Sequence, residues 1–174
     1  GDVDNCPTVA NSDQEDSTPN VPGGDACVAP SVTISDNAEV DPTVTIGENT
    51  VIDKDVVIEE GTDIGENVTV SKGLTIGPNV VIASDVVLNK SVIVGAESYV
   101  GAEVILGQGV YIGEGVTIGD GVIINRNAVI CDNAEIAPSL TIGRNAFIDT
   151  GELVTVDVDG SKALVDPSAC TLGQ

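Results

Sequence analysis

A single hydrophobic repeat runs through most of the chain. Every sixth residue from Val28 to Val154 is Val, Ile or Leu, with no insertion in the series. The residue two places before each of them is mostly small or β-branched, so two side chains point inward and one outward, as in a short strand. The residue three places after it is often one that enters the left-handed region at low cost. Residues of this kind are Asn37, Asn49, Asp55, Gly61, Asn67, Gly73, Asn79, Gly109, Gly115, Gly121, Asn127 and Asn145. Each six-residue unit is therefore predicted to be a short strand followed by a tight corner.

These units resemble the hexapeptide-repeat family over residues 28–156. Clear examples are Ile46-Gly47-Glu48-Asn49-Thr50-Val51 and Ile64-Gly65-Glu66-Asn67-Val68-Thr69. The resemblance implies an all-β fold, a left-handed parallel β-helix of triangular cross-section in which three units form one coil. The length of the series predicts about seven coils.

Many proteins of the hexapeptide-repeat family are acyltransferases, and some are zinc carbonic anhydrases. Both use histidines, and this chain has none. The acyltransferases usually carry a loop that interrupts the repeat, whereas here the repeat is continuous. No pair of nucleophile and base stands out either. The sequence therefore predicts a protein that is not an enzyme, with acyltransferase only the third choice.

The first 27 residues break the repeat. An Asp-Asn-Cys-Pro start at residues 4–7, Asn11, a Gln, and a Gly-Asp-Ala-Cys end at residues 24–27 resemble a thrombospondin type 3 calcium-binding repeat. The segment has too few apolar residues to bury a core, so a disulfide between Cys6 and Cys27 and a bound Ca²⁺ are expected to order it. The candidate Ca²⁺ ligands are Asp2, Asp4, Asn11, Asp13, Asp16 and Asp25. Residues 17–22 depart from the family pattern, and the alternative is an acidic leader without calcium.

Four cysteines without metal-ligand spacing favour an oxidising compartment, and hence a secreted or cell-surface protein. Beside Cys6 and Cys27, the second expected pair is Cys131, at a corner, with Cys170, in the tail. This bridge would tie the tail, residues 157–174, onto the β-helix; two free thiols are the alternative.

The net charge of −22 comes from 28 acidic and 6 basic residues. Such a chain is repelled by nucleic acid and by anionic membranes, and its natural small partner is a cation such as Ca²⁺. A high-salt habitat would also explain the acidity. No apolar run approaches the ~20 residues of a membrane span, so no direct insertion into a membrane is expected.

Residues 18 apart are expected to stack, which places five of the six basic residues in one corner row. The row is Asp36, Lys54, Lys72, Lys90, Gln108, Arg126 and Arg144. It could bind an acidic polysaccharide or the acidic corners of a neighbouring subunit. Alternatively, long side-chain stems cover the corner while nearby carboxylates neutralise the charge.

Two rows of outward positions are largely apolar or β-branched. One runs Thr33, Val51, Thr69, Val87, Ile105, Ile123, Thr141, and the other Glu39, Val57, Thr75, Ile93, Tyr111, Val129, Phe147. Exposed apolar faces often mark interfaces, and the family resemblance implies a homotrimer. Ordinary β-propensity is the alternative explanation.

Together these features predict a calcium-binding cap (residues 1–27), a β-helix (residues 28–156) and a disulfide-tied tail. The expected function is that of a non-enzymatic, extracellular, calcium-binding structural or adhesion protein with a polysaccharide or matrix protein as partner. A polysaccharide-binding module that uses the basic row is the alternative.

Overall fold

The computed structural model describes residues 31–171. All of these residues except Ser31 belong to one compact unit, Val32–Gln174. It contains 21 two-residue strands and one short 3₁₀ helix, η1 (Pro167–Thr171). The strands are β1 (Thr33–Ile34), β2 (Glu39–Val40), β3 (Thr45–Ile46), β4 (Val51–Ile52), β5 (Val57–Ile58), β6 (Asp63–Ile64), β7 (Thr69–Val70), β8 (Thr75–Ile76), β9 (Val81–Ile82), β10 (Val87–Leu88), β11 (Ile93–Val94), β12 (Tyr99–Val100), β13 (Ile105–Leu106), β14 (Tyr111–Ile112), β15 (Thr117–Ile118), β16 (Ile123–Ile124), β17 (Val129–Ile130), β18 (Glu135–Ile136), β19 (Thr141–Ile142), β20 (Phe147–Ile148) and β21 (Leu153–Val154).

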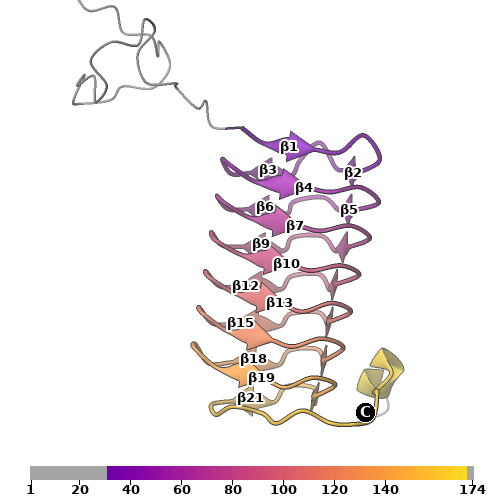
Figure 1. Cartoon of the computed structure of the whole chain (residues 1–174), viewed down its shortest axis with the longest axis vertical. Helices are drawn as coiled ribbons and strands as arrows, with labels where there is room; N and C mark the ends of the chain where they lie inside the picture. Colours follow the sequence, from indigo (N-terminus) through magenta and orange to yellow (C-terminus); the bar gives the residue numbers. More distant parts are fainter. Residues whose placement is uncertain (1–30, 172–174) are drawn as a thin grey trace, which may run out of the picture. The chain divides into compact units, whose positions relative to one another are not determined.

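The strands form three parallel sheets of seven strands each, which are the three sides of a prism (Figure 1). Sheet A runs β1-β4-β7-β10-β13-β16-β19, sheet B runs β2-β5-β8-β11-β14-β17-β20, and sheet C runs β3-β6-β9-β12-β15-β18-β21. Each residue pairs with the residue 18 positions later, as Thr33 does with Val51. This confirms the predicted all-β parallel β-helix of seven coils, an arrangement consistent with the left-handed form.

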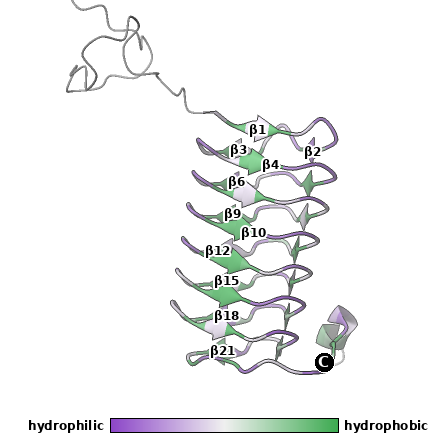
Figure 2. Ribbon diagram, viewed as in Figure 1, coloured by the Kyte–Doolittle hydropathy of each residue, from purple (hydrophilic) through white to green (hydrophobic). Residues whose placement is uncertain are grey.

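The core consists of the aliphatic residues of the six-residue repeat and the small residues two places before them. Ile52, Ile76, Ile112 and Ile124 are completely buried, and the aliphatic series of every sixth residue stays buried from Ile52 to Val154. Figure 2 shows the result, with apolar strands joined by hydrophilic corners. Three buried hydroxyls lie among these small residues: those of Thr50, Thr62 and Ser98 donate to the carbonyls of Gly65, Gly77 and Gly113, each at 2.9 Å.

The corners require left-handed backbone, as the sequence predicted. Asn49, Asp55 and Asn67 have φ values of 57–58°. Glu97 and Glu103 also adopt positive φ, although nothing in their side chains favours it. Asn37, which was expected in the same group, does not appear among the residues with positive φ.

The carboxyl end of the prism is closed by the tail. Val158 forms a parallel bridge with Ile142 at the edge of sheet A, and the Ser161 amide donates to the Arg144 carbonyl at 2.8 Å. Cys170, in η1, is joined to Cys131 by a disulfide. Within residues 31–171 no helix is both long and apolar enough to cross a lipid bilayer.

Candidate functional site

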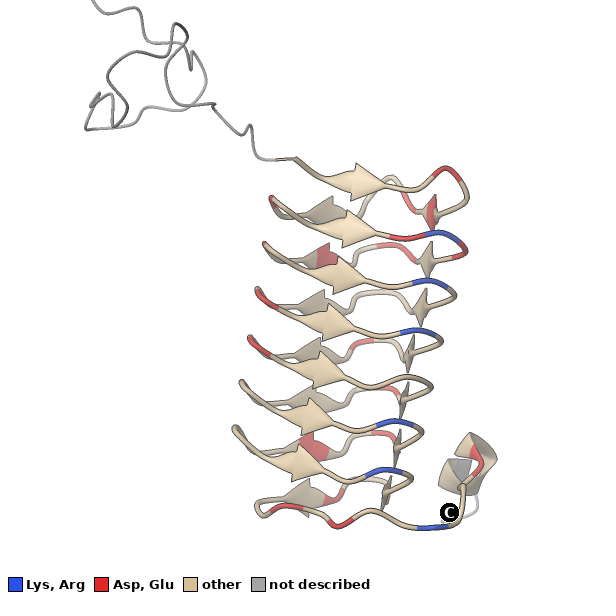
Figure 3. Ribbon diagram, in the orientation of Figure 1, with Lys and Arg blue, Asp and Glu red and all other residues tan. Residues whose placement is uncertain are grey.

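The corner between sheets A and B carries the row of cations and is called the A–B corner here. Its residues stack through backbone hydrogen bonds: the Gly73 amide donates to the Lys54 carbonyl at 3.2 Å, and the Ser91 amide donates to the Lys72 carbonyl at 3.3 Å. Figure 3 shows the basic residues above one another along this edge. The structure therefore brings together the predicted row, namely Lys54, Lys72, Lys90, Arg126 and Arg144.

The basic side chains of the A–B corner remain exposed to solvent. Within the described part of the chain, none of them forms an ion pair with a carboxylate. Asp36, Asp53 and Asp55 lie at the same corner around Lys54, so its amino-terminal end is acidic. The coils that carry Lys72, Lys90, Arg126 and Arg144 have no carboxylate at this corner, and these four cations are exposed to an anionic partner.

A shallow, open hollow lies at the amino-terminal end of the A–B corner. Ser35, Asp36, Asn37 and Lys54 line it. Asp36 and Lys54 belong to consecutive coils, because they are 18 positions apart in the stacking register. The hollow is therefore lined by a hydroxyl, a carboxylate, an amide and an ammonium from two consecutive coils.

The other two corners are acidic. The B–C corner carries Asp41, Glu59, Glu60, Glu97, Glu114, Asp132, Asp149 and Glu152. The C–A corner carries Glu48, Glu66, Asp85, Glu103, Asp120 and Asp157. Over residues 31–171 these carboxylates do not converge into a cluster that could hold a metal ion. Neither acidic row was predicted from the sequence, although the 18-residue stacking that revealed the basic row would also have shown them.

A side-chain ladder runs up the C–A corner. The Asn49 Nδ2 donates to the Asn67 Oδ1 at 3.3 Å, and the Asn67 Nδ2 donates to the Asp85 Oδ1 at 3.1 Å. At the B–C corner the Thr43 hydroxyl donates to the Asp41 Oδ1 at 2.6 Å, and the Thr43 amide donates to the same oxygen at 2.8 Å. Both hydrogen bonds lower the pKa of Asp41. The polar groups of these corners are thus engaged in holding successive residues and coils in place.

The tail covers part of the sheet B face. Val129 and the disulfide-bonded Cys131 and Cys170 form a small buried cluster, with Tyr111 and Phe147 packed against it. Burial, with the negative charges of Asp132 and Glu114, raises the pKa of Tyr111. Val129 was expected on an exposed face, but it is only 2% exposed because the tail lies over it.

The predicted calcium site and its disulfide lie outside the described residues. This holds for Asp2, Asp4, Cys6, Asn11, Asp13, Asp16, Asp25 and Cys27. They stay predictions, as do the boundary at residue 27 and an extracellular location. The Cys131–Cys170 bridge joins the two cysteines that the sequence analysis paired.

Comparison with known proteins supports the hexapeptide-repeat β-helix. A family model described as bacterial transferase hexapeptide, six repeats, matches residues 43–76 and 97–132. No curated protein matches the chain. Among solved structures, the UDP-N-acetylglucosamine acyltransferase of Francisella novicida aligns with 17% identity and a TM-score of 0.51, over 72% of this chain and 62% of that one. This likeness supports the fold.

Further solved structures that match the chain are also acyltransferases. The UDP-N-acetylglucosamine acyltransferase of Campylobacter jejuni aligns with 16% identity and a TM-score of 0.46, over 68% of this chain and 58% of that one. The acetyltransferase domain of PglB from Neisseria gonorrhoeae aligns with 26% identity and a TM-score of 0.40, over 63% and 53% of the two chains. The chain spans less than two thirds of the length of all three proteins.

These findings contradict the function that the sequence analysis expected. The predicted function of a non-enzymatic structural or adhesion protein was wrong, because a transferase family model matches residues 43–76 and 97–132. Calcium binding and an extracellular location are not tested by this match. The error lies in the weight given to the missing histidine. That absence excludes a histidine base, but carboxylates can also accept a proton in acyl transfer, so it does not exclude the reaction class.

Proposed function

We propose that this chain is the β-helix part of an acyltransferase of the hexapeptide type. It would move an acyl group from a phosphate-bearing thioester to a hydroxyl or amine. The observation that carries this proposal is the match of the transferase family model to residues 43–76 and 97–132. The A–B corner supports it, because it offers exposed cations to the phosphates of a donor on a protein that is otherwise strongly acidic.

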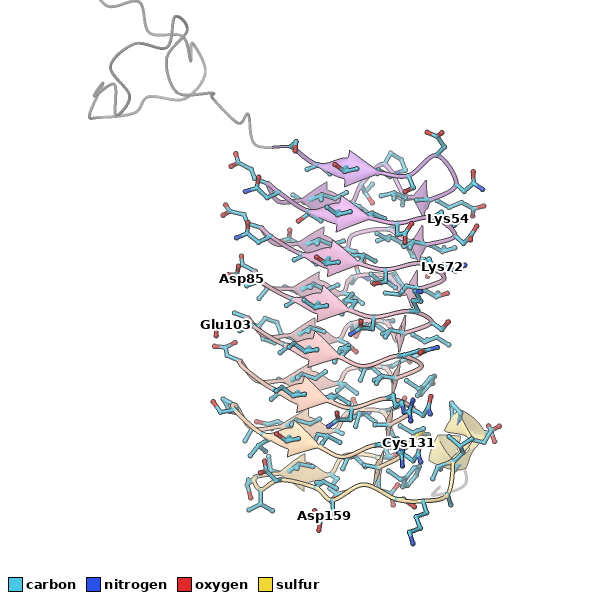
Figure 4. The ribbon with its side chains drawn as sticks, in the orientation of Figure 1. Lys54, Lys72, Asp85, Glu103, Cys131 and Asp159 are labelled. Carbon is cyan, nitrogen blue, oxygen red and sulfur yellow. A yellow bond between two sulfur atoms is a disulfide. The ribbon has the colours of Figure 1, made fainter. Side chains whose placement is uncertain are left out.

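The hollow at the A–B corner provides groups for the reaction. The Lys54 ammonium would hold the donor's phosphate as a point charge, and Lys72 on the next coil would extend this contact. The Asn37 amide can donate a hydrogen bond to the acyl carbonyl, where negative charge develops. Figure 4 shows Lys54 and Lys72 on the same edge of the prism.

Asp36 is our candidate for the proton acceptor. The hydroxyl oxygen or amine nitrogen of the substrate that receives the acyl group would attack the acyl carbonyl carbon. The proton of that hydroxyl or amine would pass to the Asp36 carboxylate. The carbon–sulfur bond then breaks, and the sulfur leaves as a thiol after taking up a proton. A carboxylate is needed in this role because the chain has no histidine.

The test is an assay of thiol release from acetyl and longer-chain acyl-coenzyme A, with sugar hydroxyl and amino-sugar acceptors. The full oxidised chain should release thiol above the rate without protein. Asp36→Asn should lower kcat by roughly 100-fold or more, the usual contribution of a general base, whereas Lys54→Ala should mainly raise KM for the donor.

Matched controls are Asp63→Asn, on the exposed face of sheet C, and Lys162→Ala, in the tail. Both should behave like the unaltered protein. No thiol release with any donor would refute the proposed activity. Thiol release that is equally fast in Asp36→Asn and in the unaltered protein would refute the role of the hollow as the catalytic site. Acyl transfer itself would remain the proposed reaction.

We also propose that the functional form is a homo-oligomer, since sheet A exposes an apolar surface along the prism.

A further inference from the structure

The outer face of sheet B carries an apolar strip toward the carboxyl end of the prism. Four outward residues stacked on consecutive coils form this strip, in the order Ile93, Tyr111, Val129 and Phe147. Ile93 is 44% exposed, whereas Val129 is buried under the tail, with Tyr111 and Phe147 packed against the same cluster. The tail therefore shields the last three residues of the strip and leaves the first in solvent.

The part of the tail that covers the strip is residues 162–171, which we call the strap. The half-buried Val165 and the buried Cys170 of the strap pack beside Val129 on sheet B. Cys170 is also bonded to Cys131, which follows β17 at the B–C corner. Figure 4 labels Cys131 on the edge of the prism that faces η1. The disulfide thus joins the strap directly to the face that it covers.

Apart from the disulfide, the strap is held weakly. The hydrogen bond from the Thr150 hydroxyl to the Cys170 carbonyl is long, at 3.4 Å. Leu164, the largest apolar side chain of the strap, is 72% exposed and adds little to the contact. The hydrogen bond from the Ser168 amide to the Asp166 carboxylate, at 2.8 Å, joins two residues of the strap to each other. The covalent bond is therefore the main attachment of the strap to sheet B.

The first part of the tail, residues 157–161, is attached in a different way. The Gly143 amide donates to the Val158 carbonyl at 2.7 Å, and the Asn145 Nδ2 donates to the Ser161 carbonyl at 2.9 Å. These hydrogen bonds lie outside the cluster that contains the disulfide. They can hold this part on the last coil, although more loosely, when the disulfide is absent.

We propose that the Cys131–Cys170 pair is a redox switch, and that its reduction releases the strap from sheet B while the prism stays folded. Holding the strap in one conformation costs backbone entropy, and without the disulfide only the packing of Val165 and Cys170 offsets that cost. The core of the prism is a separate cluster, so it keeps its packing when the strap leaves. Reduction therefore changes the state of one local element.

The switching reaction is thiol–disulfide exchange with a dithiol. A thiolate of the dithiol attacks the Cys170 sulfur, because Cys170 is 5% exposed and Cys131 is completely buried. The Cys131 sulfur leaves as a thiolate and takes up a proton. The second thiol of the dithiol then attacks the reductant's sulfur in the mixed disulfide, which releases Cys170 as a thiol and leaves the dithiol as a cyclic disulfide. Two electrons and two protons pass to the protein, and the reverse reaction reattaches the strap.

Limited proteolysis with trypsin tests the release of the strap. Trypsin cleaves after Lys and Arg, and Lys162 is the first residue of the strap. Because a protease acts on locally opened chain, cleavage after Lys162 should be at least about 10-fold faster in the reduced full chain than in the oxidised one. Equal rates in the two states overturn the proposal. Rapid cleavage within the coils after reduction also overturns it, since the prism would then have unfolded.

Cysteine variants show which pair is responsible. Cys131→Ala/Cys170→Ala should be cleaved after Lys162, without any reductant, as fast as the reduced chain. The matched control is Cys6→Ala/Cys27→Ala, which removes the other two cysteines and should still respond to reductant like the unaltered protein. Slow cleavage of the first variant overturns the proposal, and so does a control that no longer responds.

A neutral apolar dye tests what the strap covers. The fluorescence of Nile red should rise on reduction with no change in circular dichroism, because Tyr111, Val129 and Phe147 become accessible. Reoxidation should return the fluorescence and the rate of cleavage to the values of the oxidised chain. No rise in fluorescence, or no return after reoxidation, overturns the switch. None of these measurements involves acyl transfer, so this proposal and the proposed function can fail separately.

Discussion

The disulfide between Cys131 and Cys170 should determine how the carboxyl end of the prism unfolds. The two cysteines are 39 positions apart, and the loop between them contains β18 to β21 and the tail. In the chain-entropy model, a loop of this length stabilises the folded state by about 4 kcal/mol. Cys131→Ala/Cys170→Ala should therefore lower Tm by about 8–16 °C, if the whole prism unfolds cooperatively.

Amide hydrogen exchange would locate this effect. Without the bridge, the amides of Val158 and Ser161, which hydrogen-bond to the last coil, should exchange faster, while those of the middle coils should change little. Val165→Ala is the matched control, because it trims the packing of the tail against the cluster but keeps the bridge. A double alanine variant with unchanged Tm and unchanged exchange in the tail would refute this reasoning.

Three further predictions concern the core, the corners and the partly buried Tyr111. Ile112→Ala, at a fully buried position, should destabilise the protein by about 2–5 kcal/mol in urea unfolding. Ile105→Ala, at an exposed position of sheet A, should cost less than about 1 kcal/mol. Equal losses of stability would contradict the described core. Glu97→Gly should raise stability by about 0.5–1 kcal/mol in the same assay, because it relieves a left-handed φ of 57°; a loss of stability would count against strain at this corner. In a Tyr99→Phe background, absorbance at 295 nm should show a pKa of Tyr111 above the ordinary value of about 10. Because the pKa of Tyr111 is raised in the folded state, the contribution of Tyr111 to the stability of the folded protein is complete at neutral pH and is lost as the pH rises through that pKa. An ordinary pKa would indicate that the tail does not shield Tyr111.

Much of the fold could be predicted because the repeat leaves few alternatives. The aliphatic series from Val28 to Val154 determines which side chains enter the core, and the 18-residue coil then determines which corner residues stack. For the same reason the basic row was found without coordinates. The pairing of Cys131 with Cys170 also agrees with the structure, since one lies at a corner and the other in the tail that returns to it.

The tail and the function could not be predicted in the same way. Residues 157–171 have no repeat, so nothing in the sequence placed Val158 beside Ile142 or η1 over Val129. Glu97 adopts positive φ because its neighbours in the coil impose it, against its own preference. The repeat predicts that Asp36 and Lys54 share a corner row, but it does not predict that the two side chains line one hollow between consecutive coils.

The stacking of coils also gives the prism a defined mechanical behaviour. Each strand is hydrogen-bonded only to the strands 18 positions away, so a force applied to the two ends acts on one coil at a time. Each released coil should lengthen the chain by about 60 Å, the span of 18 extended residues. The segment between Cys131 and Cys170 would not contribute to this extension while its disulfide is intact. Under oxidising conditions the protein should therefore extend in regular steps, and its final length should be roughly 130 Å shorter than that of the fully extended chain. Reduction of the disulfide should restore this length.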